Sequence, residues 1–82
     1  ILDEFDLGDV HSVVEVGVGT KLKGTLAELR LPNRFGVTVI AVNRDGDVSV
    51  SPGAGFEVRE GDKLVLIGGN DPIEELRGYL AD

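Results

Sequence analysis

The stretch from Gly17 to Thr25 contains the glycine, lysine and threonine residue types that phosphate-binding loops use. In such loops backbone N–H groups surround the phosphate, and a lysine directly after the last glycine contacts it. Gly19 and Gly24 have the spacing of this motif, but Thr25 stands where the lysine is required. The dinucleotide pattern G-x-G-x-x-G also fails, because it needs a glycine where Leu22 stands. The stretch therefore predicts a turn that leads into a short helix.

Acidic residues near position 45 raise the question of a metal site. Asp45 and Asp47 flank Gly46, and Asn43 lies nearby. A calcium loop of the EF-hand type needs its glycine at the sixth position, whereas Gly46 is the fourth residue counted from Asn43. A hairpin turn accounts for the same residues, so we predict no metal ligand here. A second acidic group comprises Asp3, Glu4, Asp6 and Asp9. A solvated charge run is its simpler interpretation, and a weak divalent-ion site at an assembly interface is the alternative.

Nucleophilic catalysis has little support in this sequence. The chain has no cysteine, and its single histidine is His11. The neighbouring Ser12 does not form a triad by adjacency, since triad members meet through the fold in a specific hydrogen-bonding geometry. We predict no catalytic residue and no enzymatic activity. A small hydrolase would require Ser12 and His11 to meet an acidic group in a concave pocket.

The composition fits one small acidic domain. Its 82 residues include 8 basic and 15 acidic side chains, which gives a net charge of −7, and 41% of the residues are apolar. This balance argues against a nucleic-acid partner, because Lys and Arg supply most of the affinity for a phosphate backbone. A chain of this length buries only about 60–65% of its unfolded surface, so we expect a partner subunit. One basic cluster could meet an anion, face water or balance acidic neighbours: Lys21, Lys23, Arg30 and Arg34.

The start of the sequence leads us to expect a domain from a longer protein. The chain begins with Ile1 and shows no signal peptide. Its apolar runs, such as Leu64 to Ile67, are far shorter than the roughly 20 residues that cross a bilayer. We expect residues 1–9 to be a lead-in or linker and residues 10–82 to be the domain.

Apolar patterns and turn residues predict four strands and two helices. The expected strands are 12–16, 37–42, 47–51 and 63–67. Thr25 and Glu28 form a possible capping box for a helix over 26–30 that Pro32 ends, and Asn70 or Asp71 can cap a final helix with Pro72 at its first position. This order predicts an α+β domain with a mostly antiparallel sheet, a short helix after the first strand and a C-terminal helix across the sheet.

The hairpin around Asp45-Gly46 predicts a distinctive surface. A type I′ turn at these two residues places Ile40 and Val42 on one side of the ladder, beside Ser49 and Ser51. The opposite side, which contains Val48 and Val50, is then expected to face the domain's own core. The strip of Ile40 and Val42 is too apolar for plain solvent, so the last helix of the same chain, a second subunit or a ligand should cover it.

Several segments, taken in order, resemble the TrkA C-terminal domain, also called the RCK C-lobe. The segments are Val13-Val-Glu-Val16, Gly24-Thr-Leu-Ala-Glu-Leu29, Phe35-Gly-Val-Thr-Val-Ile-Ala-Val-Asn-Arg44, Ser51-Pro52 and Glu60-Gly-Asp-Lys-Leu-Val-Leu-Ile-Gly68. The resemblance runs from about residue 7 to residue 80. It implies a βαβββα lobe that forms a homodimer and regulates a potassium channel, a potassium transporter or a cation/proton antiporter.

The resemblance also implies where a ligand would bind. In several members of this family a small regulatory ligand, best known as cyclic di-AMP, lies between two lobes. The corresponding positions here are Val39, Ile40, Arg44, Ser51 and Pro52. Arg44 would pair with a phosphate or, alternatively, with Asp47 across the hairpin, and Ile40 would pack on a base. Ile40 and Val42 are the expected dimer contacts.

The implied setting is cytoplasmic, at a membrane channel or transporter or at the remainder of the same chain. No NAD or ATP site is expected, because the Rossmann-type lobe that precedes this domain in full-length relatives is missing here. A dimerisation module without a ligand is the main alternative function.

Overall fold

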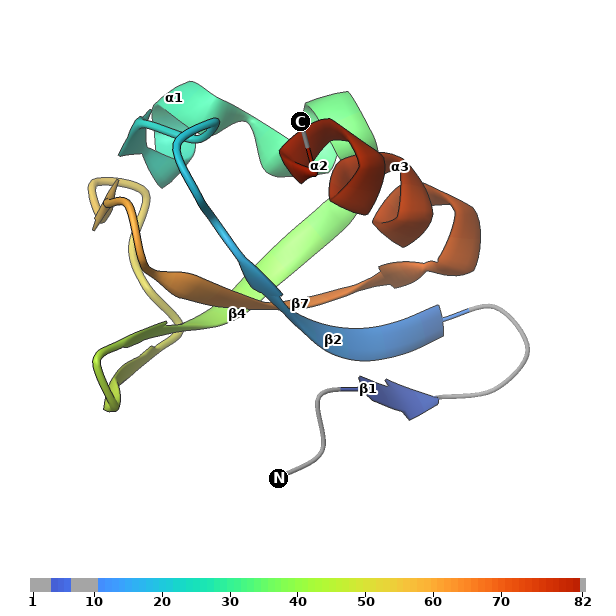
Figure 1. Ribbon diagram of the computed structural model, residues 1–82, viewed down its shortest axis with the longest axis horizontal. Helices are drawn as coiled ribbons and strands as arrows, with labels where there is room; N and C mark the ends of the chain where they lie inside the picture. The colour runs from blue at the N-terminus through green and yellow to red at the C-terminus, as the bar shows by residue number, and fades with distance from the viewer. Residues whose placement is uncertain (1–3, 7–10, 82) are drawn as a thin grey trace.

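The computed structural model describes residues 4–6 and 11–81 and shows an antiparallel sheet with its helices gathered on one face (Figure 1). The strands are β1 (Glu4–Asp6), β2 (His11–Gly17), β3 (Gly24–Thr25), β4 (Val37–Arg44), β5 (Asp47–Val50), β6 (Glu57–Val58) and β7 (Lys63–Gly69). The helices are α1 (Leu26–Leu29), α2 (Leu31–Phe35) and α3 (Asn70–Leu80). The predicted α+β class with a mostly antiparallel sheet is confirmed.

The main sheet has the strand order β1-β2-β7-β4-β5, and β3 pairs with β6 in a separate two-stranded sheet. β7, the last strand in sequence, therefore lies at the centre, between β2 and β4. Residues 4–6, within the predicted lead-in, form β1 and pair with β2. The rest of that lead-in lies outside the described residues, so the boundary between residues 9 and 10 stays a prediction.

The β4–β5 hairpin has the predicted turn and register. Asp45 and Gly46 both adopt positive φ, 53° and 87°, as a type I′ turn requires. The side chain of Asn43 stabilises the turn by accepting a hydrogen bond from the Gly46 N–H at 2.9 Å. Val42 lies opposite Ser49, and Arg44 lies opposite Asp47, as expected.

A capping box begins α1, as the sequence predicted. The Glu28 N–H donates to the Thr25 hydroxyl, and the Glu28 carboxylate accepts from the Thr25 N–H. Pro32, however, does not end this helix. Arg30 ends it by adopting a left-handed conformation (φ 51°), and Pro32 lies in the first turn of the additional helix α2. Proline fits there because the first N–H groups of a helix have no intrahelical acceptor.

The final helix packs its apolar stripe on the sheet, as expected. Ile73 and Leu76 are buried, and the helix contacts β2 and β7. Its start differs from the prediction, because α3 begins at Asn70 after Gly69, and neither Asn70 nor Asp71 forms a side-chain cap. The Asn70 side chain instead accepts a hydrogen bond from the Ser12 hydroxyl at 3.0 Å.

A β-bulge in β4 changes which side chains face the core. Val39 pairs with Leu66 and Ala41 pairs with Val65, so Ile40 is an additional residue with no partner on β7. The face that Val37 and Val39 occupy before the bulge is continued by Val42 after it, because the alternation shifts by one residue.

The bulge corrects the predicted apolar strip. Val42 is completely buried in the core of its own chain, so its side chain is not available as a dimer contact. Ile40 remains 36% exposed. Val48 and Val50, which were expected in the core, are 53% and 75% exposed. The exposed apolar surface of the hairpin therefore comprises Ile40, Val48 and Val50.

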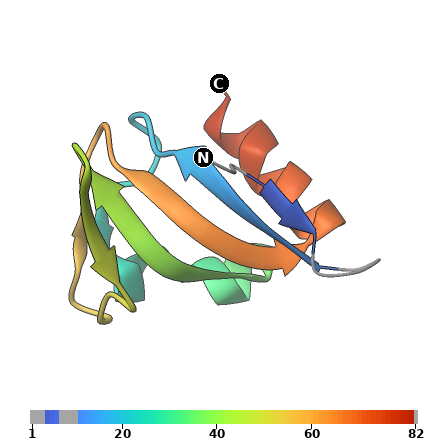
Figure 2. The ribbon, with the colours of Figure 1, turned by 90° about the horizontal axis from the view of Figure 1, so that it is seen from below.

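The core lies between the sheet and the helices. Its largest fully buried side chains are Leu22, Leu31, Leu64, Leu66 and Leu76. The opposite face of the sheet, seen in Figure 2, has no described helix in front of it. Val13, Val65 and Ile67 are half-buried there. No described helix is long and apolar enough to cross a membrane.

Candidate functional site

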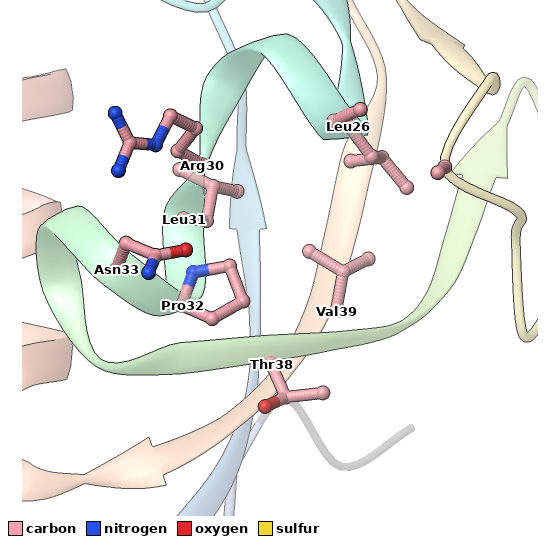
Figure 3. Close-up of a pocket in the computed structure, with 9 residues that line it drawn as sticks. Leu26, Arg30, Leu31, Pro32, Asn33, Thr38 and Val39 are labelled. Atoms are coloured by element: carbon pink, nitrogen blue, oxygen red, sulfur yellow. The ribbon is translucent and has the colours of Figure 1, made fainter.

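A pocket of about 300 Å³ opens between the two short helices and strand β4 (Figure 3). Ligand pockets in proteins commonly start near this size. Its lining residues are Leu26, Ala27, Arg30, Leu31, Pro32, Asn33, Thr38, Val39 and Ala54. Most of the lining is apolar, and Leu26 from α1 faces Val39 from β4 across the pocket. The pocket can therefore accept a flat or apolar group, and polar groups lie at its edge.

The corner between α1 and α2 shapes one side of this pocket. Arg30 has left-handed backbone geometry, which turns the chain from α1 directly into α2. The N–H groups of Asn33 and Arg34 both donate to the Arg30 carbonyl, at 3.1 and 2.8 Å, which closes the first turn of α2. Leu31 and Pro32 are thereby brought beside β4.

The loop between β5 and β6 shapes the other side. The Ala27 N–H donates to the Ala54 carbonyl at 2.9 Å, and the Leu26 N–H donates to the Phe56 carbonyl at 3.0 Å. These bonds satisfy two N–H groups at the start of α1 that have no intrahelical acceptor. They also fix Ala54 against the pocket.

The charge near the pocket differs from that of the chain as a whole. Between residues 16 and 44 the sequence has five basic residues and one acidic residue, Glu28, although the net charge is −7. Glu28 is engaged in the capping box. Arg30 lies at the pocket, and the Arg34 guanidinium stacks near Phe35 and Tyr79, with centroid distances of 5.2 and 5.5 Å. Arg30 is the one charged residue among those that line the pocket, so the edge of the pocket favours an anion over a cation.

The predicted ligand residues are distributed over three places. Val39 lines the pocket. Ile40 occupies the bulge, and its carbonyl accepts a hydrogen bond from the Ser51 N–H at 2.9 Å. Ser51 is exposed with φ 52°, and Pro52 is half-buried at the start of the loop that carries Ala54. The ligand-binding roles of these residues stay predictions.

Arg44 forms an ion pair on a different part of the hairpin. Its guanidinium donates from Nε and Nη2 to the two carboxylate oxygens of Asp62, each at 2.8 Å. The alternative pairing with Asp47 is not the one observed, although Arg44 and Asp47 lie opposite each other in the ladder. Asp62 thus occupies Nε and Nη2 of the guanidinium, and the expected pairing of Arg44 with a phosphate stays a prediction.

Asp62 is 1% exposed, and its charge is stabilised by directed hydrogen bonds. The Arg44 guanidinium lowers the pKa of Asp62 below its ordinary value, and the Arg59 N–H, which donates to Asp62 at 2.8 Å, adds to this effect. Burial acts in the opposite direction but is outweighed. The same hydrogen bond raises the pKa of Arg44. The pair is therefore charged throughout the neutral pH range.

Ser12 and His11 do not meet as a nucleophile and base. The Ser12 hydroxyl is buried and donates to Asn70, whereas His11 is exposed at the start of β2. Within residues 11–81, no group of three or more His, Cys, Asp or Glu side chains could hold a metal ion.

Sequence reasoning missed most of the pocket. Arg30 was placed in a basic cluster that could meet an anion, but the other lining residues from α1 and α2 were interpreted only as helix positions or as a proline stop. One signal was available: Arg30 and Arg34 flank Leu31-Pro32-Asn33 in a segment almost free of acidic residues. The left-handed corner at Arg30 has no comparable sequence signal, because this conformation is uncommon for arginine.

Comparison with known proteins identifies relatives of this chain. A family model described as the TrkA-C domain matches residues 12–81. The Ktr system potassium uptake protein C of Bacillus subtilis (strain 168) is 35% identical over 69 residues, which is 83% of this chain and 31% of that protein. The chain thus spans about a third of this curated relative's length.

Two solved structures show the same fold. The RCK C domain of the potassium transport protein KtrA, in complex with cyclic diadenosine monophosphate, aligns with a TM-score of 0.77 and 26% identity. The alignment covers 83% of this chain and 81% of that one. The RCK_C domain dimer of S. agalactiae BusR, also in complex with c-di-AMP, aligns with a TM-score of 0.75 and 25% identity, covering 83% of this chain and 93% of that one.

Proposed function

Because the chain belongs to the TrkA-C domain family, we propose that it is a regulatory domain that controls potassium or other monovalent cation transport by binding cyclic di-AMP between two copies of itself. The observation that carries this proposal is the apolar pocket whose one charged lining residue, Arg30, is basic although the chain has a net charge of −7. The relatives support the ligand, since two solved domains of this fold hold c-di-AMP.

The pocket suits half of such a ligand. Cyclic di-AMP is a dianion with two adenine rings related by a twofold axis. A pocket of about 300 Å³ can hold one ring between Leu26 and Val39, while Arg30 at the edge pairs with a phosphate. A second copy of the chain would supply the other pocket, so one symmetric ligand would bind two lobes.

The exposed apolar residues of the hairpin favour contact with a second copy. Ile40, Val48 and Val50 form this surface, and Val50 lies on the face of the sheet opposite to the helices. Ligand binding would favour one arrangement of the two lobes, and transport would respond through that difference in affinity.

The setting we propose is the cytoplasmic side of a membrane channel or transporter, or the remainder of a longer chain. Regulation of a cation/proton antiporter is compatible with the same mechanism. In every case the domain acts through its arrangement with a second lobe and performs no chemical reaction.

Titration calorimetry with cyclic di-AMP tests the ligand. We expect saturable binding with one ligand per two chains. Arg30→Met should weaken binding by about 10- to 100-fold, the loss expected for a charge-assisted hydrogen bond. Arg59→Met is a matched control, since the Arg59 side chain is exposed, does not line the pocket and pairs with Glu57 at 4.0 Å. It should bind as the wild type does.

Absence of heat and of a thermal shift at high ligand concentration would contradict the ligand assignment. The dimerisation module without a ligand would then be the better description of this domain.

Light scattering at micromolar concentration tests the second copy. We expect the mass of a dimer for the wild type and of a monomer for Val50→Asp, because the aspartate would bury a charge in the interface. Val50→Thr keeps the shape and serves as the control. A monomeric wild type, or a Val50→Asp variant that remains dimeric, would contradict the proposed surface.

A further inference from the structure

Arg44 joins three segments that are separate in sequence. Beyond its two bonds to Asp62, the Nη2 group donates to the backbone carbonyl of Glu57 at 2.9 Å. The guanidinium carbon also lies 5.2 Å from the centroid of the Phe56 ring. Arg44 at the end of β4 is therefore bound to the turn before β7 and to the first residue of β6, and it also contacts Phe56 in the loop before β6.

The loop that Arg44 holds is the one that carries a wall of the pocket. Phe56 contacts the guanidinium with its ring, and its carbonyl accepts the Leu26 N–H. Two residues earlier, Ala54 lines the pocket, and its carbonyl accepts the Ala27 N–H. The loop is thus attached to Arg44 on one side and to the start of α1 on the other.

Regular structure alone gives this loop little support. Between β5 and β7 its only strand is β6, two residues long and paired with β3, which is equally short. Local opening is easiest where few backbone hydrogen bonds join a segment to the core. Fixed contacts such as those of Arg44 therefore have a large influence on the loop.

We infer that Arg44 is a positioning residue: it holds the loop of Ala54 and Phe56 against α1 and thereby keeps the pocket in its binding shape. Its effect on ligand affinity rests on the function proposed above. Its effect on the loop does not.

The chemistry of arginine explains why this position needs that side chain. The planar fork contacts both oxygens of Asp62, and Nη2 reaches Glu57 while one face lies near Phe56. A lysine at the same place would keep the positive charge opposite Asp62. It could not form the paired hydrogen bonds, the bond to Glu57 and the ring contact together.

Arg44→Lys therefore separates charge compensation from positioning. Amide hydrogen exchange followed by NMR reports directly on the bonds that the Leu26 and Ala27 N–H groups donate to the loop. We expect exchange at these two amides to become about tenfold faster in Arg44→Lys, the effect of losing about one net hydrogen bond from the loop. The amides of Val14 on β2 and Leu66 on the central strand β7 report global unfolding and should keep their wild-type rates.

Arg59→Lys is the matched control, because Arg59 lies beside the same turn and its backbone bond to Asp62 survives the substitution. It should leave the Leu26 and Ala27 amides unchanged. If these two amides exchange in Arg44→Lys at the same rate as in the wild type, the inference is wrong. Acceleration of all four amides by the same factor would also overturn it, since that pattern indicates general destabilisation.

Cyclic di-AMP affinity of the same variants separates this inference from the proposed function. A several-fold weaker affinity of Arg44→Lys, together with the faster exchange, supports both. If the wild type does not bind the nucleotide but Arg44→Lys still speeds exchange at the Leu26 and Ala27 amides, the ligand assignment is wrong. The role of Arg44 in the loop is then still supported. Equal affinity of wild type and Arg44→Lys refutes the link between the loop and the pocket.

Discussion

The two faces of the main sheet differ in what covers them. On the helix side, Leu64, Leu66 and Val42 are completely buried beneath the short helices, α3 and the connecting loops. On the other side, Val65 and Ile67 of the same strand β7 are half-buried, and Val50 on the hairpin is 75% exposed. Both faces carry β-branched and aliphatic residues. Hydrophobic composition therefore does not determine which face forms the core.

The position of the helices and the register of each strand determine which face of the sheet forms the core. Side chains alternate along a strand, so a single extra residue exchanges the faces of everything that follows. The bulge at Ile40 does this within β4. The residues after it, Ala41 and Val42, occupy the faces opposite to those that regular alternation from Val37 would assign.

The sharpest test compares two valines of the hairpin. Val42→Ala should lower the free energy of unfolding by about 2 kcal/mol, because Val42 is completely buried and its removal leaves a cavity. Val50→Ala removes the same atoms from an exposed position and should change the free energy of unfolding by less than about 0.5 kcal/mol. Chemical denaturation of dilute protein measures both. Similar losses for the two variants would contradict the distinction between the faces.

A smaller effect is expected where the helical cover begins. Thr25→Ala removes the acceptor for the Glu28 N–H and should cost about 1 kcal/mol of unfolding free energy. Thr20→Ala is the control, since Thr20 is exposed in a turn outside the helix. Thermal denaturation should show a lower midpoint only for Thr25→Ala. If both variants have the same melting midpoint as the wild type, the capping box contributes nothing to the stability of the fold.

The smallest effect concerns pH. The pKa of Asp62 is lower in the folded state than in the unfolded chain, so ionised Asp62 stabilises the fold above about pH 4. This contribution should decrease as the pH falls below that value and Asp62 becomes protonated. Denaturation between pH 5 and pH 2 measures the slope. Asp62→Asn should have a shallower slope than the wild type, and identical slopes would show that Asp62 does not contribute.

The local features of the fold could be predicted where one residue type has one dominant conformation. Asp45-Gly46 gave the correct turn and register, because few sequences accept two successive positive φ angles. Thr25 and Glu28 gave the correct helix start, since the box depends on two residues three positions apart. The order of the strands in the sheet, in contrast, was not predicted, because it depends on pairing between segments that are distant in sequence.

The parts that were missed depend on contacts between distant residues. Regular alternation was assumed through Ile40, and nothing in the apolar run Val39 to Val42 marks a bulge. Arg44 was assigned a neighbour in the ladder, whereas its partner Asp62 lies 18 positions away. The pocket likewise requires that α1, α2 and the Ala54 loop meet, which no local pattern specifies.

Ile40 is not needed to direct the valines of β4 toward the core. Without it the strand would read Val-Thr-Val-Ala-Val, a regular alternation that sends Val37, Val39 and Val42 to the same side as they occupy now. Ile40 therefore adds an apolar side chain to the outer surface of the lobe, while Val37, Val39 and Val42 keep one common side beneath the helices.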